Sequence, residues 1–218
     1  MLETLQRHDL VRVEPDAWRE MLCERTDLAH LPGIAEWARR NWPVIVRRRL
    51  AGDPPGAVPA ALCLLSLQGK RRIRLQLPVE AICERVAPYT LRSAREVVPP
   101  SWQPAVDALL DLANQTGIEP CLFGSMLWQR LTGLPYLSTT SDLDLLWRIP
   151  FPAARAAVPL ARRLAAVQAR SPVRLDGEII LPDGAAANWR ELELHGGVAE
   201  VLVKTRLGVE LRSAAALQ

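Results

Sequence analysis

The first 88 residues alternate short apolar runs with polar and proline-containing segments. This pattern predicts strands at residues 8–13, 43–50 and 71–77, and helices at residues 16–25 and 33–40. Residues 78–86 are compatible with a short helix, and Asp53-Pro54-Pro55-Gly56 reads as a turn. We therefore expect a small mixed domain in this part of the chain.

After a proline-rich stretch at residues 97–104, the pattern changes to longer helices interleaved with strands. An apolar stripe at positions 106, 109, 110 and 113 predicts a helix over residues 102–116. Beyond it, the pattern predicts a short strand running into Gly124 and then a helix ending near Gly133. A strand around residues 142–148 and a helix at residues 152–170 should follow. The remaining elements are expected to be strands, at residues 173–181, 191–194, 198–204 and 208–211.

Together these elements favour the α+β class with two domains. We expect a small mixed N-terminal domain at residues 1–88, a linker at residues 89–104, and a second domain at residues 105–218 with a mixed sheet and flanking helices.

Composition adds limits rather than an assignment. The chain has 218 residues, 49% of them hydrophobic, and a net charge of only +3, which does not argue for nucleic acid. Its longest uncharged apolar run, at residues 58–67, is too short to span a bilayer, and its first residues lack the apolar core of a signal peptide. Four widely spaced cysteines favour buried, reduced thiols in a cytoplasmic protein: Cys23, Cys63, Cys83 and Cys121.

The local distribution of charge is more informative than the net value. Two basic clusters lie in the first half of the chain: Arg47, Arg48 and Arg49, and Lys70, Arg71, Arg72 and Arg74. Either cluster could attract a polyanionic ligand such as a triphosphate or a coenzyme. Equally, either could be a solvated edge that discourages sheet aggregation.

Two carboxylates share one face of the strand around residues 142–148. Asp142 and Asp144 are two residues apart, so they point the same way, whereas Leu143 points to the other face. Carboxylates held roughly 6–7 Å apart along a strand repel each other unless a cation lies between them. Mg²⁺ prefers such oxygen ligands together with substrate phosphates, so this strand predicts a magnesium site.

A phosphate-binding turn is predicted just before that strand. Gly124 would let the backbone approach a phosphate closely, and Ser125 would lie at a helix N-terminus, where free N–H groups attract anions. A glycine and serine before a helix are common, as is a lone pair of aspartates. A glycine-serine turn followed by two aspartates, both between apolar strands, is a much more specific indication of a phosphate- and metal-binding site.

A third carboxylate is expected on the strand that begins near residue 173. Asp176 is our choice, and Glu178 is the alternative because it would lie on the same face. Asp176-Gly177 could instead form a hairpin turn.

With these residues in view, the second half of the chain resembles the nucleotidyltransferase superfamily of DNA polymerase β. The segments FGSMLWQRLTGLPYL, SDLDLLW, RLDGEIILPDG, NWREL and VLVKT, preceded by WPVIVRRR and GKRRIRLQL, narrow the resemblance. They are similar to the malonate decarboxylase holo-acyl-carrier-protein synthase family, also called phosphoribosyl-dephospho-CoA transferases, over nearly the full length.

The resemblance implies a reaction. An enzyme of this family transfers phosphoribosyl-dephospho-CoA from triphosphoribosyl-dephospho-CoA to a serine of the apo acyl-carrier subunit of malonate decarboxylase, and pyrophosphate leaves. The N-terminal domain would be an accessory or substrate-binding domain, and residues 105–218 the catalytic domain.

The resemblance also implies roles for individual residues. Asp142, Asp144 and Asp176 would be the catalytic, Mg²⁺-binding carboxylates. The substrate-binding residues would be Gly124, Ser125, Lys204, Arg47 and Arg48, although Lys204 could equally be a surface lysine. Neither nucleic acid nor membrane is expected as a partner.

Two other functions stay open. The chain could be a nucleotidyltransferase for another acceptor, such as the citrate lyase carrier, a different protein, a small molecule or RNA. It could also be a non-catalytic module that only holds a nucleotide, although the retained Gly124-Ser125 and both aspartates speak against loss of activity.

Overall fold

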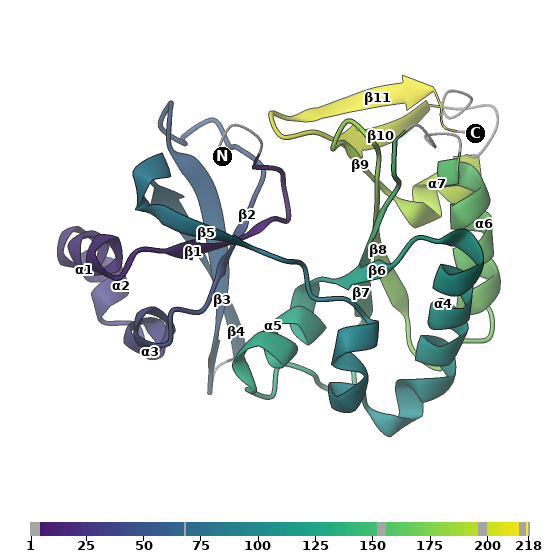
Figure 1. The fold of residues 1–218 in the computed structure, drawn as a ribbon, viewed down its shortest axis with the longest axis horizontal. Coiled ribbons are helices and arrows are strands. Elements are labelled where there is room, and N and C mark those ends of the chain that lie inside the picture. Colours follow the sequence, from purple (N-terminus) through teal and green to yellow (C-terminus); the bar gives the residue numbers. More distant parts are fainter. Residues whose placement is uncertain (1–4, 68, 152–155, 196–199, 214–216, 218) are drawn as a thin grey trace. The chain divides into compact units, whose positions relative to one another are not determined.

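Two compact units, Met1–Pro88 and Tyr89–Gln218, make up the chain in this computed structural model (Figure 1). The structure describes residues 5–67, 69–151, 156–195, 200–213 and 217. Each unit combines helices with a β-sheet of its own, which confirms the predicted α+β class. No helix in the described residues is long and apolar enough to cross a membrane.

The first unit is built on a five-stranded antiparallel sheet in the order β4-β3-β2-β1-β5. Its strands are β1 (Leu10–Val13), β2 (Val44–Val46), β3 (Val58–Ser66), β4 (Gly69–Leu77) and β5 (Ile82–Val86). Its helices are α1 (Pro15–Glu24), α2 (Thr26–Ala29), α3 (Ile34–Arg39) and the short 3₁₀ helix η1 (Val79–Ala81). Trp18 and Trp37 from α1 and α3 are buried in its core.

Three predictions for this unit were wrong or incomplete. The helix expected at residues 78–86 is η1 followed by strand β5, because Val86 and its neighbours pair with β1. Strand β3 was not predicted, since its continuous apolar run lacks the alternation that marks a half-buried strand. Cys23 and Cys83 are exposed rather than buried, although all four cysteines are free thiols.

The second unit is built on a six-stranded sheet in the order β11-β10-β9-β8-β7-β6, in which only β7 and β8 pair in parallel among the described strands (Figure 1). The strands are β6 (Pro120–Leu122), β7 (Leu143–Arg148), β8 (Leu175–Ile180), β9 (Ala186–Asn188), β10 (Glu200–Lys204) and β11 (Val209–Ser213). The helices are η2 (Arg92–Val97), η3 (Pro100–Trp102), α4 (Gln103–Thr116), α5 (Gly124–Thr132), α6 (Ala157–Gln168) and α7 (Trp189–His195).

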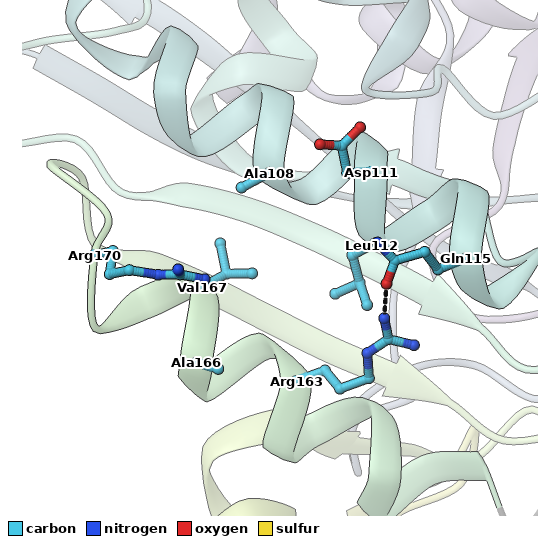
Figure 2. Close-up of a pocket in the computed structure, with 8 residues that line it drawn as sticks. All are labelled: Ala108, Asp111, Leu112, Gln115, Arg163, Ala166, Val167 and Arg170. Atoms are coloured by element: carbon cyan, nitrogen blue, oxygen red, sulfur yellow. Dashed lines mark hydrogen bonds between the residues drawn. The ribbon is translucent and has the colours of Figure 1, made fainter.

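Helices α4 and α6 lie side by side (Figure 2). The predicted stripe of α4 is buried, with Val106 and Leu109 fully so. A shallow pocket of about 280 Å³ lies between the two helices, and Arg163 donates a hydrogen bond to Gln115 at its side. All eight residues that line this pocket come from the two helices and their ends, so it is separate from the predicted carboxylate strands.

One element of this unit was predicted as the wrong type of secondary structure. Residues 191–194, predicted as a strand, belong to helix α7, where Leu192 is buried at the interior face. Strand β9 was not predicted, because Ala186–Asn188 has neither the length nor the side chains typical of a strand. Of the helix predicted at residues 152–170, α6 covers Ala157–Gln168, and residues 152–155 lie outside the described residues.

Residues 89–104, expected as a linker, hold η2 and η3 and pack onto the second unit. The amide of Leu91 donates to the carbonyl of Pro120 at 2.9 Å, and Thr90 forms a bridge with Cys121. This segment is therefore attached to the edge strand β6 by an isolated bridge.

Candidate active site

The parallel pair β7 and β8 brings two predicted carboxylates together. Asp144 and Asp176 are direct partners in the register, although 32 residues separate them in sequence. Directly opposite residues of neighbouring strands project from the same face, so both carboxylates lie on one face, here named the acid face. On the other face Leu143, Leu145 and Trp147 are buried.

The predicted turn lies directly against the first carboxylate. Gly124 has a φ of +58°, and a Cβ added there would lie 2.0 Å from Oδ2 of Asp144. The amide of Phe123 donates to the carbonyl of Asp144 at 3.1 Å, which ties the turn to β7. Only glycine allows both this backbone conformation and this approach.

Helix α5 starts at this turn. Ser125 is its second residue and is half-buried, and the helix ends at Gly133, whose φ of +74° makes it the predicted stop. The first amides of a helix have no partner within it and carry the positive end of its dipole. A phosphate placed beside Asp144 would therefore face these amides.

Asp142 precedes β7 rather than lying in it. Its carboxylate accepts a hydrogen bond from Arg174, with 3.1 Å between Nη1 and Oδ2. The side chain of Arg174 is 62% exposed and that of Asp142 is 30% exposed. The sequence predicted that Asp142 and Asp144 share a face, but it gave no indication of this arginine. Release of the exposed pair would cost little, since surface ion pairs contribute on the order of 0–1 kcal/mol.

Asp176 is held in place by two donors. Its Oδ1 accepts from its neighbour's amide, Gly177 N, at 2.8 Å and from Nδ2 of Asn188 at 3.2 Å. Asn188 also accepts from the amide of Arg190 at 2.9 Å through its Oδ1. This asparagine was missed at the sequence level, since it lies in the unpredicted strand β9. Asp176-Gly177 lies within β8, so the alternative of a hairpin turn was wrong.

Glu178, the rival third carboxylate, has a different environment. It is 7% exposed and accepts a hydrogen bond from Lys204, with 2.8 Å between Nζ and Oε1. Lys204 was expected to contact a phosphate, and the structure pairs it with this carboxylate. Since Glu178 already has a cation and lies opposite Leu146 rather than Asp144, Asp176 is the better third carboxylate.

An apolar cluster borders the carboxylates on the acid face. It consists of Cys121, Leu146, Ile180 and Ala186, with Phe123 packed against them. Burial raises the pKa of the Cys121 thiol, so this thiol stays protonated near neutral pH. Such surroundings lower the local dielectric and strengthen electrostatic contacts made at the site.

The acid face fits Mg²⁺ through two carboxylates rather than a closed cage. Within the described residues, no group of three or more His, Cys, Asp or Glu side chains is arranged to hold a metal ion. Mg²⁺ is usually held by one or two carboxylates together with substrate phosphates. Asp144 and Asp176 would supply those carboxylates, and Gly124 brings the start of α5 close to Asp144.

The two arginines predicted to bind substrate, Arg47 and Arg48, lie in the first unit, where Arg47 has a structural partner. Its guanidinium donates to Asp53 at 2.8 and 2.5 Å and to the carbonyl of Ala60 at 3.1 Å. The side chains of Arg47 and Asp53 are only 15% and 3% exposed. This contact holds the pKa of Asp53 well below its usual range. Arg48 is half-buried, whereas the cations of β4 are exposed.

Two family models match the chain. They are described as the phosphoribosyl-dephospho-CoA transferase MdcG N-terminal domain, over residues 6–88, and the MdcG C-terminal domain, over residues 90–215. The boundary between the two matched ranges coincides with the boundary in the sequence between the two structural units, at Pro88 and Tyr89.

Full-length relatives carry the same description. Proteins named phosphoribosyl-dephospho-CoA transferase from Bradyrhizobium diazoefficiens and Xanthomonas campestris pv. campestris are 40% identical over 202 residues and 39% identical over 212 residues. These alignments cover 91% and 97% of this chain and 86% and 95% of the two relatives. A relative of that name from Pseudomonas aeruginosa is 34% identical over 173 residues, covering 75% of this chain and 79% of the relative. No solved structure matches the chain.

Proposed function

This chain belongs to the phosphoribosyl-dephospho-CoA transferase family, and we propose that it transfers that group to a serine of an acyl-carrier protein by nucleotidyltransferase chemistry. The donor would be triphosphoribosyl-dephospho-CoA, and pyrophosphate would leave. The observation that carries the proposal is the direct contact of Gly124 with Asp144, which is itself in register with Asp176.

In this proposal the turn binds the outer phosphates of the donor. Gly124 brings backbone close to Asp144, and helix α5 begins at this same residue. Backbone donors at a helix N-terminus stabilise phosphate charge without any rearrangement during the reaction. Ser125 would add a hydroxyl donor from the second position of the helix.

The carboxylates position the reacting groups. Asp176 keeps a fixed orientation because Oδ1 takes two hydrogen bonds, which leaves Oδ2 for the site. Mg²⁺ bound by Asp144 and Asp176 would neutralise phosphate charge and lower the pKa of the acceptor hydroxyl. Asp142 would join them once it is released from Arg174.

The chemical step is a displacement at the α-phosphorus. The serine hydroxyl releases its proton to solvent, and its oxygen forms the new bond to phosphorus. The bond to the pyrophosphate oxygen breaks, and pyrophosphate leaves with the bonding electrons. The product is a phosphodiester between the serine and the transferred group. Most of the rate enhancement in such reactions comes from positioning and electrostatic stabilisation. The apolar cluster beside the carboxylates would exclude water, the competing nucleophile.

We propose the carrier subunit of malonate decarboxylase as the acceptor. The sequence segments in α5, β8 and α7 that resemble the malonate decarboxylase family support this acceptor over the acceptors of other nucleotidyltransferases. The citrate lyase carrier would need the same carboxylates and is the second candidate, together with other protein, small-molecule or RNA acceptors.

Intact mass spectrometry tests the reaction and the site together. The apo carrier subunit of malonate decarboxylase is incubated with this protein, Mg²⁺ and triphosphoribosyl-dephospho-CoA. We expect a mass gain equal to the phosphoribosyl-dephospho-CoA group. Asp144→Asn should reduce the rate at least about a thousandfold, on the order of 4 kcal/mol of barrier. The matched control is Asp111→Asn, which changes an exposed aspartate on α4.

Each other outcome points to a different error. No mass gain, with a known transferase active on the same carrier, would refute the malonate decarboxylase acceptor and call for the citrate lyase carrier. A mass gain that survives Asp144→Asn would refute the assigned site.

A further inference from the structure

Exposed apolar side chains gather on the hairpin formed by β10 and β11. Leu202 is 38% exposed, Leu207 75%, Val209 52% and Leu211 61%. Leu202 and Leu211 are direct partners across the two strands, and Leu207 lies in the turn between them. We call these four residues the hairpin patch.

The sheet register places this patch on the acid face. Ile180, Ala186, Lys204 and Val209 are successive partners across four strands, so their side chains project from one face. Asp176 lies four residues before Ile180 on the same strand, an even number, and therefore shares that face. The two paired leucines of the patch each lie two residues from this row, so they share it as well.

The same hairpin is buried on its opposite face. Val201 and Val203 alternate with Leu202 along β10, and they are 1% and 0% exposed. The apolar residues on the acid-facing side of the hairpin are therefore not needed to form the hydrophobic core. The Lys204–Glu178 pair lies between the patch and the carboxylates, so the acid face is continuous from Asp144 to β11.

We propose that the hairpin patch is the docking surface for the protein that accepts the transferred group. The inference rests on the proposed function, because it requires a protein acceptor. The acceptor hydroxyl must reach a phosphorus held over Asp144 and Asp176, so the body of the acceptor must rest on the same sheet face. From β8, the hairpin begins two strands away and β11 lies three strands away, about 14 Å at the usual strand spacing.

The size of the patch favours a partner that binds and leaves. Its four side chains expose on the order of 400 Å² of apolar surface, near the largest patch of a typical monomer. A stable dimer usually buries about 800 Å² on each partner. Charged residues border the patch at Glu200, which lies two residues before Leu202 on β10, and at Arg206 in the turn, which is the usual anatomy of a protein interface. An acceptor that dissociates after each turnover suits these dimensions better than a second copy of this chain.

The test is a double substitution, Leu202→Ser with Leu211→Ser, on two exposed positions of the sheet. The control is Leu194→Ser, which changes a leucine on α7 that is 73% exposed and lies outside the hairpin. Initial rates are measured against carrier concentration and against donor concentration. Binding of the apo carrier to Asp144→Asn protein, with and without the patch substitutions, is measured separately. We expect the KM for the carrier and its Kd to rise about tenfold or more, with kcat and the KM for the donor unchanged.

Four results would overturn the inference or separate it from the proposed function. An unchanged KM and Kd for the carrier would overturn it. A rise in the KM for the donor alone would show that the patch holds the coenzyme instead. Sedimentation that shows a dimer converted to a monomer by the substitutions would make the patch a self-association surface. If the wild-type protein transfers nothing, the proposed function fails, and the binding measurement still decides whether the carrier docks here.

Discussion

Single residues decide the geometry of the candidate site, and Gly124 is the clearest example. The sequence pattern predicts a phosphate-binding turn at this residue, because glycine lets the backbone approach a phosphate closely. In the structure its α-carbon also approaches Asp144, with a positive φ that other residues adopt only under strain. The requirement for glycine is therefore set by the protein itself, before any ligand binds.

Gly124→Ala should strongly reduce transfer while leaving most of the fold intact. The new methyl group would overlap Oδ2 of Asp144, so either the carboxylate or the start of α5 must move. We expect kcat/KM to fall at least about a hundredfold, with the circular dichroism spectrum unchanged. Gly133→Ala is the control, since its φ is also positive but a Cβ there meets nothing within 4 Å. Equal losses of activity in both variants would contradict the argument.

The Arg47–Asp53 pair couples stability to pH. Because the folded-state pKa of Asp53 is held below its usual range, its contribution is fully present above the unfolded pKa, about 4, and is lost as the pH falls toward the folded value. We expect the free energy of unfolding of wild-type protein to decrease below about pH 5. Asp53→Asn should flatten that decrease and destabilise the protein at pH 7 by on the order of 3 kcal/mol.

Urea unfolding at pH 7 and pH 3.5 measures both effects. Asp107→Asn serves as the control, since its ion pair with Arg95 is half-exposed. A pH dependence identical in Asp53→Asn and wild type would show that other carboxylates cause the acid loss.

At the scale of elements, the sequence predicted most helices and strands, and its failures have local causes. The apolar stripe of α4 and the strands that carry the carboxylates follow from the periodicity of hydrophobic residues. The end of α5 follows from the backbone conformation that glycine allows. Helix α7 was mistaken for a strand because Glu191–Leu194 is too short to distinguish the two periods. Because strand β9 was not predicted, Asn188, which donates a hydrogen bond to Asp176, was not recognised as a site residue.

The parallel pairing of β7 with β8 depends on a second glycine. A Cβ at Gly177 would lie 1.8 Å from the carbonyl oxygen of Leu145, and its φ is +135°. Gly177→Ala should therefore separate the two strands locally and destabilise the protein by about 3 kcal/mol or more. A thermal melt compared with Gly208→Ala, where a Cβ meets nothing within 4 Å, checks this. A Tm within about 2 °C of wild type would show that the strands yield without cost.

At the scale of the whole molecule, charge is distributed unevenly. The net charge is only +3, yet β4 is an edge strand whose exposed side chains include four cations: Lys70, Arg71, Arg72 and Arg74. Sequence analysis left open whether they protect the edge or attract a polyanion. The structure shows an exposed edge, which both functions require.

Arg72→Gln with Arg74→Gln distinguishes these two functions. If the cations attract a polyanionic substrate, its KM should rise about threefold to tenfold at low ionic strength and less at 0.5 M salt, because screening weakens the attraction. If they only protect the edge, kinetics should be unchanged and the variant should aggregate sooner on concentration. Light scattering and steady-state rates on the same samples provide both readouts, with Arg19→Gln on α1 as the exposed control.

The register of β7 with β8 also bears on how the family can vary in length. Asp144 and Asp176 are aligned by ladder hydrogen bonds and not by the 26 or so residues that connect the strands. Insertions or deletions in that connection would leave the carboxylates side by side. One residue gained or lost inside β8 would instead turn Asp176 to the opposite face of the sheet. Length differences among relatives should therefore accumulate between the two strands and be absent within them.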